Sequence, residues 1–155
     1  LSKTGLSNYI NSSEGVLYVE LQAFINGGSL VNDSRRISLN DTTNDERLLL
    51  ELDENANTIK AFLTSMGNNI GSVEVTDVNQ LQLNKIAVVY NINSLKIFIN
   101  GILKDEDLTI SSVPSGLSVL SFSDGVGDFR FYGKCKDLRV YNEALTDAEL
   151  QTLTT

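Results

Sequence analysis

The chain of 155 residues contains no histidine and no tryptophan, and it has one cysteine and one proline. Histidine is the commonest general base and the commonest transition-metal ligand, so its absence excludes every Ser-His or Cys-His nucleophile pair. The single cysteine, Cys135, excludes an intramolecular disulfide. No run of about 18 apolar residues occurs, so the sequence predicts no membrane-spanning helix.

Basic residues are also few, with 12 Lys and Arg against 20 Asp and Glu and a net charge of −8. Affinity for nucleic acids comes largely from Lys and Arg contacts to phosphates, so we expect no nucleic-acid partner. An acidic surface mainly serves solubility. The chain begins at Leu1 without a methionine or an apolar signal segment, which indicates a domain excised from a longer protein.

Short stretches of alternating apolar and polar residues, separated by turn signals, fill most of the chain. Alternation with period two predicts β-strands that are buried on one face. The strongest local signal is Asn100-Gly101 between two apolar runs, which is the preferred type I′ hairpin turn. Strands are predicted over residues 15–25, 35–40, 46–52, 58–64, 69–75, 83–90, 95–99, 102–105, 117–122, 129–132 and 138–141.

Helical periodicity appears only near the C-terminus, after Leu145. Residues 146–149 (TDAE) form a capping box, in which Thr146 and Glu149 each bond the other's backbone N–H. Many short strands followed by one helical turn predict a single all-β domain over residues 1–155. We expect an antiparallel sandwich with a short C-terminal helix.

Two blocks of the sequence resemble laminin-G-like domains of the concanavalin A-like lectin/glucanase superfamily. One is residues 129–153 (FRFYGKCKDLRVYNEALTDAELQTL), where a strand exits through a tight turn into a terminal helix. The other is residues 85–105, where Ala87, Val88 and Tyr90 match an "AV-x-Y" strand and Asn100-Gly101 match the "NG" that follows. The family usually has Trp-His where this chain has Leu83-Asn84.

The resemblance implies a jelly-roll sandwich of two curved antiparallel sheets, but no particular ligand. The superfamily mostly recognises carbohydrates or other proteins, and only some members are enzymes. The acidic composition, the Asn-rich turns and the missing tryptophan are similar to modules of phage virion proteins and marine bacterial surface proteins. We therefore expect an extracellular or virion-surface location.

Catalysis is disfavoured by the stretch that comes nearest to the superfamily's glucanase motif, Glu-x-Asp-x-x-Glu. Residues 51–56 (ELDENA) supply Glu51 and Asp53, but Ala56 stands where the second catalytic glutamate belongs. Retaining hydrolysis needs two carboxyl groups only about 5 Å apart. The stretch is read as a strand that runs into a solvated acidic turn, so we expect no enzyme activity.

A structural calcium ion is the one cofactor that the resemblance admits. Calcium binds six to eight oxygen ligands, mostly carboxylates and carbonyls. Asp124 and Asp128 place two carboxylates around the flexible sequence Gly125-Val126-Gly127 and are the candidate ligands. The alternative is that aspartate and glycine serve the turn itself.

Carbohydrate sites combine an aromatic face with planar polar groups. The candidate contacts are Arg35, Arg36, Tyr90, Arg130 and Tyr132. For each arginine the alternative is a solvated or salt-bridged strand face. The remaining candidates are assigned to the core, namely Phe24, Phe62, Phe98, Phe122 and the thiol of Cys135.

These observations favour a non-catalytic carbohydrate-binding, lectin-like recognition module. The alternative is a structural or adhesive domain of a phage virion or cell-surface protein, which acts through protein–protein contacts. An assembly domain of that kind exposes an apolar patch of several hundred Å² and runs as an oligomer. The expected partners are accordingly a glycan or polysaccharide, or other virion or surface proteins.

Overall fold

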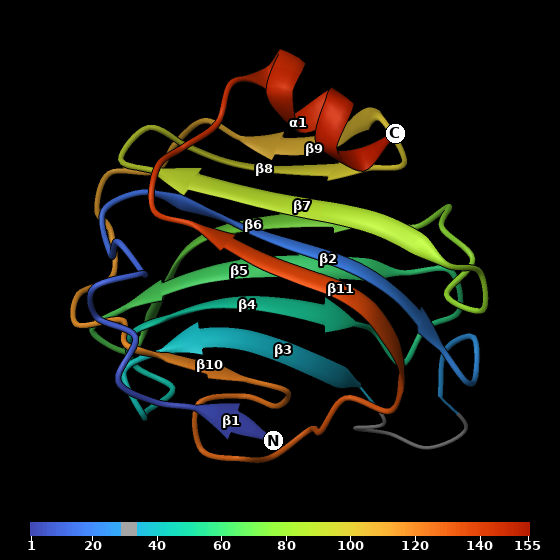
Figure 1. The fold of residues 1–155 in the computed structure, drawn as a ribbon, viewed down its shortest axis with the longest axis horizontal. Coiled ribbons are helices and arrows are strands. Elements are labelled where there is room, and N and C mark those ends of the chain that lie inside the picture. The colour runs from blue at the N-terminus through green and yellow to red at the C-terminus, as the bar shows by residue number, and fades with distance from the viewer. Residues whose placement is uncertain (29–33) are drawn as a thin grey trace.

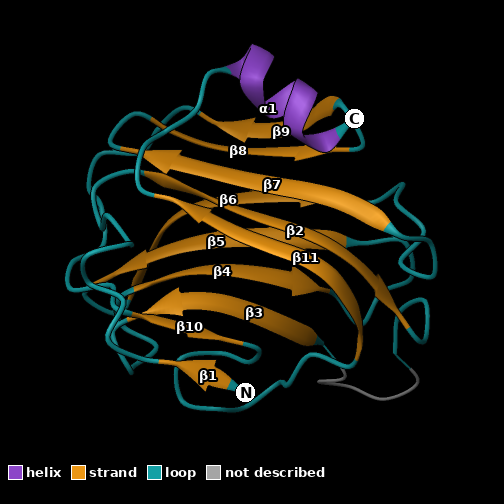
Figure 2. Ribbon diagram, in the orientation of Figure 1, coloured by secondary structure: helices purple, strands orange, loops and turns teal. Residues whose placement is uncertain are grey.

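Two antiparallel sheets pack face to face in the computed structural model, which describes residues 1–28 and 34–155 (Figures 1 and 2). The six-stranded sheet has the order β1-β10-β3-β4-β5-β6, and the five-stranded sheet has the order β11-β2-β7-β8-β9. The strands are β1 Ser2–Lys3, β2 Gly15–Ala23, β3 Arg35–Asn40, β4 Arg47–Leu52, β5 Ile59–Ser65, β6 Asn68–Val75, β7 Asn84–Asn91, β8 Ser94–Ile99, β9 Ile102–Asp107, β10 Val119–Ser121 and β11 Gly133–Tyr141. The predicted all-β sandwich is confirmed.

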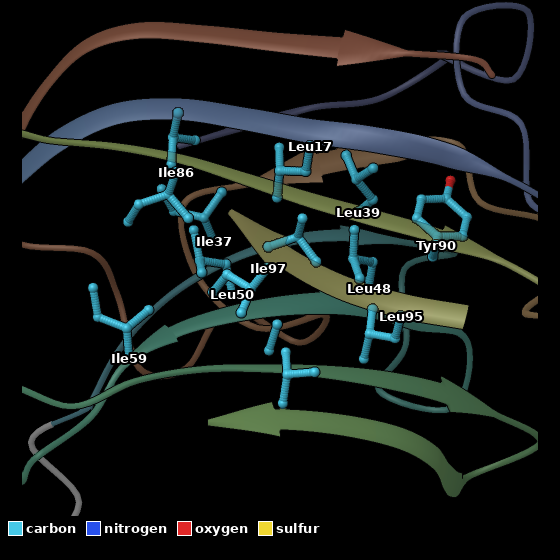
Figure 3. Close-up of a cluster of buried hydrophobic side chains, with 14 of the residues drawn as sticks. Leu17, Ile37, Leu39, Leu48, Leu50, Ile59, Ile86, Tyr90, Leu95 and Ile97 are labelled. Carbon is cyan, nitrogen blue, oxygen red and sulfur yellow. The ribbon is translucent and has the colours of Figure 1, made fainter. Parts of the chain in front are cut away.

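The core lies between the sheets, where alternate residues of each strand point inward (Figure 3). In β4, Leu48, Leu50 and Leu52 are buried in this core. The residues that alternate with them, Arg47, Leu49 and Glu51, therefore belong to the outer face of the six-stranded sheet, the face turned away from its partner sheet.

Local turn and capping signals are observed as predicted. Asn100 and Gly101 both have positive φ, 51° and 83°, and Ile99 pairs with Ile102 across the turn. Both central residues of a type I′ turn need positive φ, which Asn and Gly tolerate best. The helix α1, Asp147–Thr154, begins with the predicted capping box at Thr146.

The helix α1 covers part of the outer face of the five-stranded sheet, beside β7, β8 and β9 (Figure 1). Leu150 of the helix packs in a second, smaller apolar cluster with Val16 and Phe98. Phe98 is therefore a core residue, as predicted. No helix among the described residues is long and apolar enough to cross a membrane.

Several sequence-based assignments are wrong. Phe24 is 62% exposed at the end of β2, and Cys135 is exposed because β11 bulges between Cys135 and Asp137. Phe62 was also assigned to the core, but it lies on the outer face of the six-stranded sheet. Phe122, in contrast, is partly buried and packs against the core, in agreement with its assignment. The predicted strand 129–132 is loop, apart from a single bridge at residue 130.

Candidate functional site

The outer face of the six-stranded sheet carries two hollows. The larger, 470 Å³, is called the β10 hollow and is lined by Leu1, Ser2, Thr4, Asn40, Thr42, Val119, Ser121, Ser123, Gly125, Val126, Gly127 and Arg130. The other, 380 Å³, is called the β4 hollow and is lined by Arg36, Asn44, Asp45, Arg47, Leu49, Glu51, Phe62, Thr64, Gly67 and Asn69. Both are lined mainly by polar side chains.

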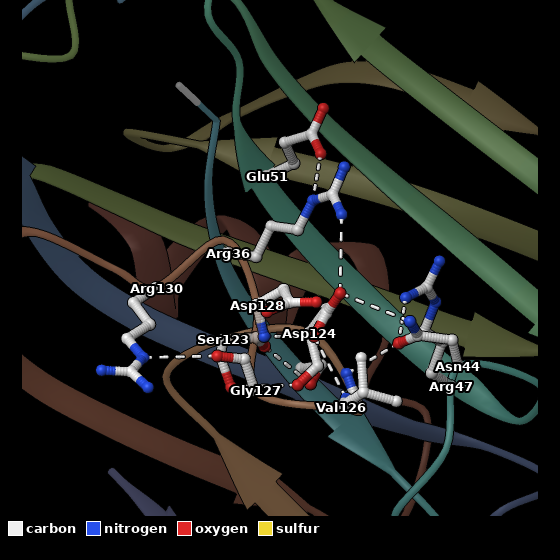
Figure 4. Close-up of polar contacts among 12 residues, drawn as sticks. Arg36, Asn44, Arg47, Glu51, Ser123, Asp124, Val126, Gly127, Asp128 and Arg130 are labelled. Atoms are coloured by element: carbon white, nitrogen blue, oxygen red, sulfur yellow. Dashed lines mark hydrogen bonds and ion pairs between the residues drawn. The ribbon is translucent and has the colours of Figure 1, made fainter. Parts of the chain in front are cut away.

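The segment 123–128 is fastened to the loop between β3 and β4 (Figure 4). The backbone N–H of Gly125 donates to Asn44 Oδ1 at 2.8 Å, and Asn44 Nδ2 donates to Asp124 Oδ2 at 3.3 Å. Asp124 is 3% exposed, and its Oδ1 accepts from the N–H groups of Val126 and Asp128. These bonds hold the wall of the β10 hollow against the edge of the β4 hollow.

Arg36, in β3, is held by three neighbours. Its Nε donates to Glu51 Oε2 at 2.5 Å. Its Nη1 lies 3.8 Å from Asp124 Oδ2, and its guanidinium carbon lies 3.8 Å from the centre of the Phe129 ring. Two carboxylates and an aromatic ring therefore fix the orientation of this side chain, and its free N–H groups remain able to donate to a ligand.

Glu51 and Asp53, the carboxylates that match the glucanase motif in sequence, are each paired with a cation. Glu51 pairs with Arg36, and Asp53 Oδ2 lies 2.7 Å from Lys60 Nζ. Burial raises the pKa of Glu51, and Arg36 acts in the opposite direction. Burial also acts to raise the pKa of Asp53, but hydrogen bonds from Lys60 and Asn55 outweigh it and hold that pKa below its usual value. Both carboxylates are almost fully buried within these pairs.

The β4 hollow contains residues that sequence reasoning did not assign to a binding site; among them is Phe62, which it placed in the core. Arg47 and Leu49 come from β4, Phe62 comes from β5 directly opposite Leu49, and Asn69 comes from β6. Arg47 Nη1 donates to Asn44 Oδ1 at 2.5 Å. The result is a small apolar surface, formed by Leu49 and the partly exposed Phe62, surrounded by planar polar groups.

The sequence of this sandwich matches the model of a known protein family. The model of the concanavalin A-like lectin/glucanases superfamily matches residues 21–151, which is most of the chain. The chain belongs to this superfamily. The resemblance read from residues 85–105 and 129–153 is thereby confirmed. A comparison with curated proteins finds no match.

Solved structures share the fold of this superfamily member at low sequence identity. CBM40 of the Ruminococcus gnavus IT-sialidase, bound to α2,3-sialyllactose, has a TM-score of 0.72 and 16% identity, over 100% of this chain and 98% of that one. Domain 4 of an extracellular GH43 arabinanase from Geobacillus stearothermophilus, in complex with arabinotriose, has a TM-score of 0.69 and 16% identity, over 94% and 68%. A heptameric SAP-like pentraxin from Limulus polyphemus has a TM-score of 0.66 and 14% identity, over 95% and 72%.

Two of the predicted sugar contacts lie in the interior of this concanavalin A-like domain. Tyr90 has no exposed surface, because its position in β7 points into the core and its hydroxyl donates to the carbonyl of Asn11. Arg35 is 2% exposed and donates to the carbonyls of Ile25 and Asp53. The expectation that Tyr90 and Arg35 meet a ligand at the surface is therefore wrong.

The other predicted contacts are accessible, but they do not all lie together. Arg36 lines the β4 hollow and Arg130 lines the β10 hollow, and a backbone bridge joins the two residues. Tyr132 is 63% exposed and directly precedes β11, a strand of the opposite sheet. Arg36 and Arg130 thus remain candidate contacts on one face, while Tyr132 is separate from them.

The carboxylates of Asp124 and Asp128, the predicted calcium ligands, differ in their surroundings. Both oxygens of Asp124 accept hydrogen bonds, from Val126, Asp128 and Asn44, and Asp128 is exposed. Among residues 1–28 and 34–155 no group of three or more Asp, Glu, Cys or His side chains is arranged to hold a metal ion. Calcium at Asp124 and Asp128 stays a prediction, and the geometry favours the turn alternative.

Replacing Gly125 by alanine is expected to lower the free energy of unfolding by about 1–3 kcal/mol, the usual cost of an added methyl group in a packed site. A Cβ at this position would lie 1.7 Å from the carbonyl oxygen of Thr43, so the segment must move away from the loop between β3 and β4. Urea unfolding measures the effect. Val126→Ala in the same loop is the control, since Val126 is 60% exposed, and equal stability of the two variants would contradict the prediction.

Proposed function

We propose that the chain is a non-catalytic carbohydrate-binding module whose ligand lies on the outer face of the six-stranded sheet. The observation that carries this proposal is the β4 hollow, where planar polar groups surround an aromatic ring. Sugars present apolar C–H faces that pack on aromatic rings, and hydroxyl groups that need hydrogen-bond partners around the edge. Phe62 supplies the ring, and Arg36, Asn44 and Asn69 supply donors and acceptors.

Binding of this kind benefits from side chains that are already ordered, because less conformational entropy is then lost on association. Arg36 is fixed by Glu51, Asp124 and the Phe129 ring. Asn44 is fixed by the N–H of Gly125. A ligand that fills the β4 hollow would therefore meet a largely pre-formed surface.

The structural relatives support the proposal. The Ruminococcus gnavus CBM40 was solved with sialyllactose, and the arabinanase domain was solved with arabinotriose. Both proteins share this fold over nearly the whole of the present chain. A carbohydrate-binding role also agrees with an extracellular or virion-surface location, which we propose together with it.

The absence of catalysis is part of the proposal. A retaining glycosidase needs one free nucleophilic carboxylate and one acid/base carboxyl group across a cleft. Here Glu51 is neutralised by Arg36 and Asp53 by Lys60, and residue 56 is alanine. The charges in the β4 hollow are arranged to hold side chains in place.

A role in protein–protein contact is the second candidate. It is favoured by an apolar hollow beside α1, lined by Tyr141, Leu145, Ala148, Glu149, Thr152 and Leu153. A virion or surface protein that docks there would leave the β4 hollow free. Self-association in sedimentation experiments, without any glycan binding, would favour this candidate.

The test of the carbohydrate proposal is a glycan and polysaccharide screen followed by titration of Phe62→Ala. Loss of the ring is expected to weaken binding about tenfold or more, as for an aromatic residue at the centre of a contact. Phe24→Ala is the matched control, because Phe24 is 62% exposed at the end of β2 in the other sheet. The same titrations with calcium and with a chelator test Asp124 and Asp128.

Either of two results would contradict the proposal. One is a folded protein that binds no glycan in the screen. The other is binding that Phe24→Ala weakens and Phe62→Ala leaves unchanged, which would place the ligand on the five-stranded sheet.

A further inference from the structure

Arg47 is a cation of the β4 hollow that forms no ion pair with a carboxylate of residues 1–28 or 34–155. Within the described residues no carboxylate oxygen forms an ion pair with its guanidinium; the pairs of Arg36, Lys60, Lys96, Lys104, Lys136 and Arg139 are the ones observed. Its Nη1 donates to Asn44, and its Nε is buried and has no hydrogen-bond partner in the part of the chain that the structure describes. Buried polar groups are normally satisfied, so this site lacks an acceptor.

The surroundings of Arg47 do not neutralise it. Arg36 is already paired with Glu51 and Asp124. Burial lowers the pKa of Arg47, and the charge of Arg36 lowers it further, while the charges of Asp124, Glu51 and Asp45 act in the opposite direction without outweighing them. An anionic group placed at Arg47 would stabilise the buried charge and offset its repulsion from Arg36.

We propose that Arg47 selects glycans that carry a carboxylate, so that the ligand of the β4 hollow is an acidic sugar. This rests on the proposed function and names its substrate class. A guanidinium group binds a carboxylate through two parallel N–H···O bonds, and such charge-assisted pairs are about twice as strong as neutral hydrogen bonds. The net charge of −8 opposes an anionic ligand, but physiological salt screens charges that lie farther away than about 8 Å. Of the two carboxylates that line the β4 hollow, Glu51 is paired with Arg36 and Asp45 is exposed to solvent.

The spacing along β4 suits one sugar ring. Arg47 and Leu49 are successive outward-facing residues, and Phe62 lies directly opposite Leu49. Successive residues on one face of a strand are about 7 Å apart. A sugar that packs on Phe62 and Leu49 can therefore extend a carboxylate from its ring to Arg47.

The experiment compares ligands that differ only in that charge. Trigalacturonic acid is titrated against its methyl ester, and 3′-sialyllactose against its methyl ester, by calorimetry. The intact domain is expected to bind at least one acid about tenfold more tightly than its ester, which is the usual size of a charge-assisted bond. Arg47→Gln should bring the ratio of acid to ester affinity close to one, which separates loss of charge recognition from a general weakening of the hollow.

Arg139→Gln is the charge-matched control, since Arg139 lies on β11 of the other sheet and is mostly exposed. It should leave both titrations unchanged. Arg47→Lys keeps the charge but loses the two-pronged geometry and should retain part of the preference for acids. Arg47→Lys replaces Arg47→Gln as the test variant if Arg47→Gln fails to fold.

Equal affinity of the intact domain for acids and esters would overturn this proposal and leave the carbohydrate role standing. Preference for neutral glycans, or for sulfated glycans without carboxylates, would overturn it in the same way. Failure to bind any glycan would instead contradict the proposed function itself.

Discussion

Replacing Arg36 by glutamine is expected to lower the free energy of unfolding at pH 7 by about 3–5 kcal/mol, the usual cost of breaking a buried ion pair by removing one partner. Glu51 is 5% exposed, and its Oε2 accepts from Arg36 Nε at 2.5 Å. Without Arg36 the carboxylate keeps its burial but loses its cation. Asp124, which is 3% exposed, loses a second favourable charge in the same step.

The loss should depend on pH, with a sign that follows from Glu51. Burial raises the pKa of this carboxyl group and Arg36 opposes that effect, so removal of Arg36 raises the folded-state pKa further. A carboxyl group whose folded-state pKa exceeds its unfolded value contributes stability below the unfolded pKa, and this is lost as pH rises through the folded pKa. The deficit of Arg36→Gln should therefore be smaller at pH 4 than at pH 7.

The pH dependence that Asp53 gives to stability has the opposite sign, so it must be separated from that of Glu51. Its folded-state pKa lies below the usual value, so it contributes stability at neutral pH that is lost as pH falls through that pKa. Asp53 keeps its partner Lys60 in the Arg36→Gln variant. Its contribution is therefore similar in both proteins and largely cancels in the difference between them, apart from the hydrogen bond that it shares with Glu51.

Urea unfolding at pH 4, 5.5 and 7 measures the prediction for the parent, for Arg36→Gln and for the double variant Arg36→Gln/Glu51→Gln. The double variant should recover much of the stability at pH 7, because the buried charge is gone. A deficit of Arg36→Gln that is equal at every pH, or a double variant no better than the single one, would show that the loss of stability does not come from an unpaired charge on Glu51.

The sequence predicted those features of the fold that depend on local patterns. The sandwich follows from period-two alternation, the β8–β9 hairpin from Asn100-Gly101, and the start of α1 from the capping box at Thr146. Each of these signals lies within a few residues. They can be recognised without knowing which strands pair or in which order the strands lie in a sheet.

The face on which a side chain lies was harder to predict. Arg35 and Arg36 are neighbours in β3 and so point to opposite faces, but the sequence RRISLN does not show which of them is buried. The stretch RLLLEL of β4 reads as one apolar run, although its alternation places Arg47 on the outer face. The same alternation in β5 groups Phe62 with Lys60 and Thr64 and could have identified it as an outer residue.

The candidate site could not be assembled from the sequence because its parts are far apart in the chain. Asn44 bonds Asp124 and Gly125 across 80 and 81 residues. Arg36 joins Glu51 through strand register and Asp124 through a loop that folds back. The register of the strands and the path of the loop are properties of the tertiary fold. A local signal such as "Asp-Gly" therefore indicated a turn and no more.

Replacing Gln80 by alanine is the second large effect that we expect, a loss of about 3–5 kcal/mol in the free energy of unfolding. Gln80 has no exposed surface, and its Nε2 donates to the carbonyls of Asp53, Thr58 and Asn55. Its Oε1 accepts from Arg35 and from the N–H of Gly27. Each buried polar group left without a partner costs about 1–3 kcal/mol, and several are affected at once. Thermal and urea unfolding measure the loss.

Gln22→Ala is the control, since that amide makes one exposed hydrogen bond, to the carbonyl of Leu81. Gln80→Glu separates two explanations of the loss. A carboxylate would strengthen the contact with Arg35 but can no longer donate to the carbonyls of Asp53 and Thr58. If Gln80 matters as a donor to these carbonyls, Gln80→Glu should be destabilised nearly as much as Gln80→Ala. Stability equal to the parent would mean that Gln80 acts chiefly as the acceptor for Arg35, and that the turn after β4 keeps its shape without it.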